Sequence, residues 1–166
     1  MTNPKFCEHP LLDIDGWRNV AIPVVLHADG ARFQERDSLL TISLKGLLFS
    51  RTSKKDAHML IGSLPKSVST KAAVEELWAV VQWSCAALLD GRHPLTDHLG
   101  HAWPSGSSRA QLAGHPLHPD GLRGVVWGVC GDLDFFSKEL GLPHPAATEF
   151  CFRCKANRSD LPWNDF

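Results

Sequence analysis

Residues 122–154 read LRGVVWGVCGDLDFFSKELGLPHPAATEFCFRC, and this stretch decides the fold that the sequence predicts. It opens with an apolar, β-branched run at 125–129 between two glycines, which is typical of a buried strand in a parallel sheet. Asp132 follows at once, and apolar residues then recur at helical spacing until Pro143. The stretch therefore predicts a strand that ends on a carboxylate, at the edge where open α/β sheets place their ligands.

The short helix expected after this strand has apolar residues at Leu133, Phe136, Leu140 and Leu142. Asp132 precedes the helix, where an aspartate side chain often accepts a hydrogen bond from a free backbone N–H of the first turn. The residue thus has two candidate roles, a metal ligand and a helix cap. Asp134 is the alternative ligand if Asp132 only caps the helix.

Three further strands are expected upstream. Residues 21–30 form an apolar run that ends on Asp29-Gly30, residues 39–48 alternate apolar with polar side chains, and residues 58–64 form a short apolar segment. A charged connection at 31–37 separates the first two strands. Asp29 also has two candidate roles, because Asp-Gly is among the commonest turn dipeptides and a strand-end carboxylate is a suitable metal ligand.

The clearest helix is predicted at 71–90, where apolar residues recur at intervals of three and four and Ser69 or Thr70 can cap the first turn. From 91 to 121 the composition changes to histidine, proline, glycine and serine, which indicates a long surface loop within one domain. We therefore expect a polar N-terminal segment at 1–20, an α/β domain at 21–142 with a mixed sheet, and a tail at 143–166.

Composition limits the possible functions. The chain has 166 residues, 43% of them hydrophobic, which suits one globular domain with a core. The formal net charge is −1, so no overall positive field favours nucleic acid, and a DNA contact would be local. The N-terminus lacks a signal-peptide pattern, and no run approaches the roughly 18 apolar residues of a membrane span. These features predict a soluble, intracellular protein that does not bind a membrane.

The order strand, strand, strand, helix, strand is the opening order of the ribonuclease-H-like fold, in which the first and fourth strands are neighbours. That topology would bring Asp29 and Asp132 to one sheet edge. Two close carboxylates repel each other unless a cation neutralises them, and Mg²⁺ prefers oxygen ligands. A pair of such ions roughly 3.5–4 Å apart supports in-line phosphoryl transfer. The sequence therefore predicts a magnesium site that acts on phosphodiesters.

Several short motifs resemble those of eukaryotic DDE transposases of the CACTA or Plavaka kind. They are Asp29-Gly30, Leu64-Pro65-Lys66, Glu75-Glu76-Leu77-Trp78, Gly131-Asp132-Leu133 and Cys151-Phe152-Arg153-Cys154. Each is weak alone, and the resemblance depends on their order and spacing over roughly residues 20 to 155. It implies DNA strand cleavage and transfer, a nuclear location, and the two aspartates as the first two catalytic acids.

The resemblance also implies a third acid on a later helix, after a fifth strand, and the printed sequence has no such pair of elements. Asp165 lies downstream of Asp132, but the residues around it show no helical pattern, so it is not expected to be that ligand. We therefore expect a partial catalytic domain. The alternative from another class is a non-catalytic, zinc-stabilised module that binds nucleic acid or protein.

Cys151 and Cys154 have the spacing with which two thiolates hold one tetrahedral zinc ion. The resemblance likewise implies a zinc-binding insertion here. Two thiolates are half of a site, and the candidate partners are His144, or Cys7 and His9 near the N-terminus. A redox pair of the thioredoxin kind is less favoured, because that motif should open a helix directly after a strand.

Five of the nine histidines lie in the loop at 91–121. Two pairs have a two-residue gap, His98 with His101 and His115 with His118, but neither pair lies on an expected helix. Solvated side chains are the expected state, with metal binding as the minor alternative. In the same loop, Trp103 is expected either to cover apolar surface or to stack on a base.

Overall fold

The protein is described by a computed structural model in which residues 8–34, 37–48, 58–144 and 146–149 are described. It is a mixed α/β fold whose four-stranded sheet has the order β3-β2-β1-β4. The strands are β1 (Ala21–Gln34), β2 (Asp37–Gly46), β3 (His58–Pro65) and β4 (Arg123–Gly131). β1 pairs antiparallel with β2 and parallel with β4, and β2 pairs antiparallel with β3. The predicted mixed sheet, with its first and fourth strands as neighbours, is confirmed.

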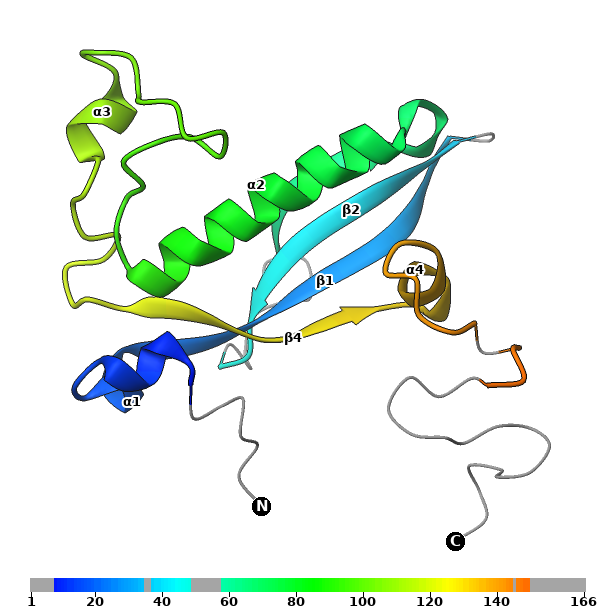
Figure 1. Cartoon of the computed structure of the whole chain (residues 1–166), viewed down its shortest axis with the longest axis horizontal. Coiled ribbons are helices and arrows are strands. Elements are labelled where there is room, and N and C mark those ends of the chain that lie inside the picture. Colours follow the sequence, from blue (N-terminus) through cyan, green and yellow to red (C-terminus); the bar gives the residue numbers. More distant parts are fainter. Residues whose placement is uncertain (1–7, 35–36, 49–57, 145, 150–166) are drawn as a thin grey trace, which may run out of the picture.

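A single long helix, α2 (Lys71–Asp90), crosses one face of this sheet (Figure 1). It begins at Thr70, whose side chain accepts a hydrogen bond from the Ala73 N–H at 3.1 Å, and it ends at Gly91 in the left-handed conformation. Of the two caps that the sequence predicted, Ser69 and Thr70, the structure therefore uses Thr70. α2 is also long and apolar enough to cross a membrane by length and composition alone.

The core lies between α2 and the sheet. The alternate residues Val24, Leu26 and Ala28 of β1 are buried together with Val81 of α2 and with alternate residues of β2. Two glycines allow the helix to come close. A Cβ on Gly62 would stand 2.7 Å from the Leu77 side chain, and one on Gly124 would stand 3.1 Å from the Leu88 side chain.

The smaller helices lie at opposite ends of the sheet (Figure 1). The 3-10 turn η2 (Pro10–Asp13) and α1 (Trp17–Val20) precede β1, and α4 (Leu133–Lys138) follows β4. A second 3-10 turn, η3 (Lys66–Val68), joins β3 to α2. The N-terminal segment, which we expected to be polar, contributes the buried Leu11.

Two boundaries differ from the sequence expectation. β1 continues to Gln34 and β2 begins at Asp37, so paired strand occupies most of the expected connection at 31–37. The last helix ends at Lys138, and its buried residue is Phe135. Leu133, which we expected on the apolar face, is 64% exposed. The predicted apolar stripe was wrong at Leu133, whereas Phe136 packs partly buried against the core; the adjacent phenylalanines left open which side of the helix would face the sheet.

The loop at 91–121 is held by internal hydrogen bonds and aromatic packing, and it contains α3 (Ser108–Leu112). The Trp83 indole N–H donates to the Thr96 carbonyl at 3.1 Å, and the Trp103 N–H donates to the Pro94 carbonyl at 2.8 Å. The two indole rings meet edge to face with centroids 6.2 Å apart. Trp103 thus covers apolar surface at the end of α2, which is one of its two expected roles.

Candidate functional site

The two candidate aspartates lie side by side on neighbouring strands, next to the carboxyl end of β4. Ala28 of β1 pairs with Gly131 of β4, and each is followed directly by one of the aspartates. β4 ends at Gly131, beside α4 (Figure 1), whereas β1 continues past Asp29 to Gln34, so Asp29 lies within its strand and not at the strand end that the sequence predicted. The backbones of Asp29 and Asp132 are therefore brought together, as the sequence predicted.

Asp132 caps α4. Its Oδ1 accepts a hydrogen bond from the Phe135 N–H at 2.6 Å. Phe135 is 4% exposed and belongs to the core, so the cap fixes the start of α4 over the sheet. The second oxygen, Oδ2, has no hydrogen-bond partner among the described residues. One carboxylate could therefore cap the helix and also ligate a cation.

Asp29 points to the other side of the sheet. Its neighbours Ala28 and Gly30 face α2 and Lys66, so strand alternation places the Asp29 side chain on the opposite face. Its backbone carbonyl accepts a hydrogen bond from the Thr41 hydroxyl at 3.1 Å, whereas its carboxylate has no hydrogen-bond partner in the described part of the chain. The structure thus joins the two aspartates through their backbones and separates the directions of their side chains.

A charged hollow of about 140 Å³ opens beside Asp132. Its lining residues are Gly30, Leu40, Lys66, Asp132, Asp134, Phe135, Lys138 and Glu139. Asp29 does not line it. The floor at residue 30 is bare backbone, and a Cβ there would stand 3.2 Å from Lys66 Nζ. Two ammonium groups and three carboxylates therefore share this small space, which we call the charged hollow.

Asp134, the alternative ligand, is held by Lys138. The Lys138 ammonium donates to Oδ2 of Asp134 at 2.6 Å, one turn along α4. That hydrogen bond and the positive charge of Lys138 lower the pKa of Asp134, with smaller contributions from His144 and Lys66. The carboxylate is thus available in its ionised form, but a cation would compete with Lys138 for one oxygen.

The proposed zinc ligands fall mostly outside the described residues. Cys151, Cys154 and Cys7 lie outside them, and His144 and His9 lie within them. Nδ1 of His144 accepts a hydrogen bond from the Ala146 N–H at 3.0 Å. A ring that accepts at Nδ1 carries its proton on Nε2 when neutral, so zinc binding through Nε2 would require this hydrogen bond to break.

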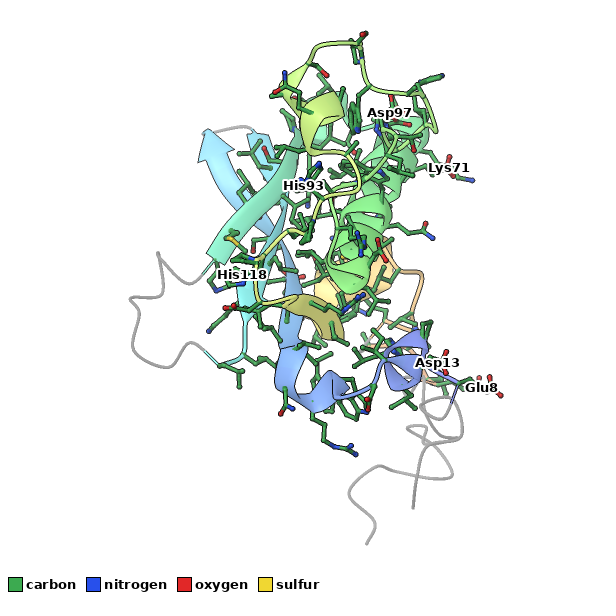
Figure 2. All side chains as sticks on the ribbon, turned by 90° about the vertical axis from the view of Figure 1, so that its left-hand side faces the viewer. Glu8, Asp13, Lys71, His93, Asp97 and His118 are labelled. Carbon is green, nitrogen blue, oxygen red and sulfur yellow. The ribbon has the colours of Figure 1, made fainter. Side chains whose placement is uncertain are left out.

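The loop histidines contact carboxylates of the protein. Nε2 of His98 lies 2.5 Å from Oε1 of Glu76, which ties the loop to α2. Nδ1 of His101 lies 3.3 Å from Oδ2 of Asp97. Figure 2 shows His93 and Asp97 on this loop and His118 near its other end. Across the described residues, no group of three or more histidine, cysteine or acidic side chains is arranged to hold a metal ion.

Sequence reasoning missed the central place of Lys66 and Gly30 in this site. The sequence indicated Lys66 as the lysine of the Leu-Pro-Lys motif and Gly30 as half of a turn dipeptide, but it did not indicate that the two residues meet. Strand alternation was the available signal, because it places Gly30 on the face opposite Asp29. Comparisons with models of known protein families, with curated proteins and with solved structures find no match to this chain.

Proposed function

We propose that this chain carries part of a ribonuclease-H-like catalytic domain of the DDE transposase kind, which cleaves and transfers DNA strands with Mg²⁺. One observation carries the proposal: Ala28 pairs in parallel with Gly131, so Asp29 and Asp132 follow paired residues at one sheet edge. The sheet order β3-β2-β1-β4 with α2 between β3 and β4 supports the same architecture.

The described residues suit parts of this chemistry. Bound Mg²⁺ would stabilise negative charge on the phosphodiester and activate the attacking hydroxyl or water. Asp132 can offer Oδ2 while Oδ1 caps α4, and Asp134 is the alternative ligand. Asp29 has a carboxylate without a described partner, but it extends from the other face of β1. The proposal therefore requires the two carboxylates to reach one cation around the end of β4.

A second candidate function is a non-catalytic module stabilised by zinc. It is favoured by the geometry of Asp132, which already has a structural role as a cap, and by the absence of Asp29 from the charged hollow. Cys151 and Cys154, with His144 as a third ligand, would supply the zinc site, and DNA or protein would be the partner. The first candidate implies DNA as the partner and, through the transposase resemblance, a nuclear location.

Binding of Mn²⁺ in place of Mg²⁺ separates the two candidates. The proposal expects paramagnetic broadening of the Ala28 and Gly131 amide signals, with an affinity that falls at least about tenfold in either Asp29→Asn or Asp132→Asn. Asparagine preserves the cap at residue 132 while it removes the charge. Asp120→Asn is the control, since Asp120 is an exposed loop residue that precedes β4, whereas Asp132 follows the other end of that strand.

If Asp29→Asn binds Mn²⁺ like the wild type, the shared site is wrong and the non-catalytic candidate stands. Zinc is measured separately by metal analysis of the purified protein. We expect Cys151→Ser to lose a zinc ion that the wild type retains. Equal metal in both proteins would remove the zinc site from either candidate.

A further inference from the structure

A second cavity lies at the opposite end of the sheet from the charged hollow. It has a volume of about 530 Å³, within the range of small-molecule sites. Its lining residues are His9, Leu11, Trp17, Arg18, Ala21, Pro23, Val125, Val126 and Trp127. We call it the amino-end cavity, because β1 and β4 both begin beside it. The proposed nuclease function makes no use of it.

Apolar groups dominate its walls. Leu11 comes from the N-terminal segment, Pro23 from β1, and Val125 and Val126 from β4. Trp127 is 70% exposed, which is unusual for an indole and leaves a broad apolar surface at the rim. These walls suit a ligand with an apolar body about the size of one or two rings.

The polar side chains in the lining are all donors. Arg18 stacks over the Trp17 ring at 4.4 Å, and it forms no ion pair with a described carboxylate. Nδ1 of His9 accepts a hydrogen bond from the Leu11 N–H at 3.1 Å, so the neutral ring keeps its proton on Nε2. The indoles can only donate. None of the lining side chains is a carboxylate, amide or hydroxyl, so the complementary ligand is an acceptor.

Nearby acids do not alter this pattern. Glu8, Asp13 and Asp15 belong to the same N-terminal segment, but none of them lines the cavity. Figure 2 shows Glu8 and Asp13 at the outer edge of that segment. The positive charge of Arg18 therefore stands without a carboxylate inside the cavity itself.

We propose that the amino-end cavity binds a small molecule with an apolar, ring-sized body and one anionic group. The body packs between Trp17, Trp127 and the β4 valines, and the anionic group accepts from the guanidinium of Arg18. A carboxylate, sulfonate or phosphate ester has the same acceptor chemistry, and the Arg18 stack on Trp17 holds the guanidinium ready for it.

The test compares two dyes with almost the same body, anilinonaphthalene sulfonate and the uncharged phenylnaphthylamine. Arg18→Gln should weaken the sulfonate dye about tenfold and leave the neutral dye unchanged, because it removes one charge-assisted contact. Arg109→Gln is the matched control, since Arg109 stacks over Trp103 at 4.9 Å in the same way but lines no part of this cavity. Ala21→Leu should weaken both dyes by filling the cavity.

Equal losses in Arg18→Gln and Arg109→Gln would overturn the proposal, as would unchanged binding of both dyes to Ala21→Leu. Circular dichroism of each variant shows that the fold is retained. The class of ligand is then tested by competition. Naphthoate and a short single-stranded oligonucleotide are each titrated into the dye complex, and displacement of the bound dye is measured. Displacement by naphthoate supports a small anionic ligand, whereas displacement by the oligonucleotide alone means that the occupant is nucleic acid and the proposal is wrong.

Discussion

The two ends of the sheet carry opposite kinds of surface. At the carboxyl end of β4, beside Gly30 of β1, the charged hollow holds two lysines and three acids in about 140 Å³. At the amino ends, the amino-end cavity has about 530 Å³ with mostly apolar walls and a single arginine. The difference follows from chain direction, since α4 begins directly after β4 and its first turn needs a capping carboxylate.

The comparison also shows how the two ends depend on the core. The charged hollow is built on Phe135, whose ring packs against Trp78 of α2 at a centroid distance of 6.3 Å and against Phe136 at 5.5 Å. The amino-end cavity is built on η2, α1 and the first residues of β1 and β4. Changes at α4 should therefore damage one end and spare the other.

Removal of the Phe135 ring should have the largest effect. Phe135→Ala leaves a cavity in the core and should lower the free energy of unfolding by about 3–5 kcal/mol, measured by urea denaturation. Leu133→Ala in the same helix is the control and should stay within about 0.5 kcal/mol, because Leu133 is exposed. The amino-end cavity should still bind the anionic dye in Phe135→Ala under native conditions, and loss of the dye there would show that the two ends are not independent.

A methyl group at Gly131 should have the next largest effect. Its Cβ would stand 2.7 Å from the Ala28 carbonyl oxygen and would also strike the Phe135 ring. Gly131→Ala should therefore cost about 1–3 kcal/mol through displacement of α4 or of the strand pair. Gly128→Ala on the same strand is the matched control, since nothing lies within 4 Å of its Cβ position. Equal midpoints of denaturation for the two variants would contradict this close approach.

The cap at the start of α4 should have a smaller effect. Asp132→Ala should lower the free energy of unfolding by about 0.5–2 kcal/mol, because the Phe135 N–H loses its acceptor. Asp132→Asn should remain close to the wild type, since the amide oxygen replaces Oδ1. Thermal denaturation of both variants measures the difference. If alanine and asparagine were equally stable, the side chain at 132 would not act as a cap.

The smallest effect concerns the pKa of Asp134. The hydrogen bond from Lys138 lowers this pKa in the folded chain, so the ionised carboxylate favours the folded state. That contribution is complete above the ordinary aspartate pKa and is lost as the pH falls through the lowered folded value. Lys138→Gln should raise the pKa of Asp134 toward its ordinary value, which an NMR titration of the carboxyl carbon measures. An unchanged titration would show that Lys138 does not hold Asp134 in solution.

Much of the fold follows from local patterns. The alternation in residues 39–48 and the three-and-four spacing in 71–90 predicted β2 and α2, because each period matches one backbone geometry. The order of the elements also predicted that β1 and β4 would be neighbours. The side of α4 that faces the sheet could not be predicted, because Phe135 and Phe136 are adjacent in the sequence. In the structure, Phe135 packs against Trp78 and is the more deeply buried of the two.

The candidate site divides in the same way. The sequence by itself determined that Asp29 and Asp132 lie on neighbouring strands, and that Asp132 precedes a helix it can cap, but its prediction that the first strand ends at Asp29 was wrong because pairing with β2 extends β1 to Gln34. Only the tertiary structure decided that Asp29 faces away from α2, that Lys66 lies over Gly30, and that Trp17 and Trp127 line one cavity. These contacts join residues that are far apart in the chain. They depend on strand register and packing, which the local spacing of apolar residues does not determine.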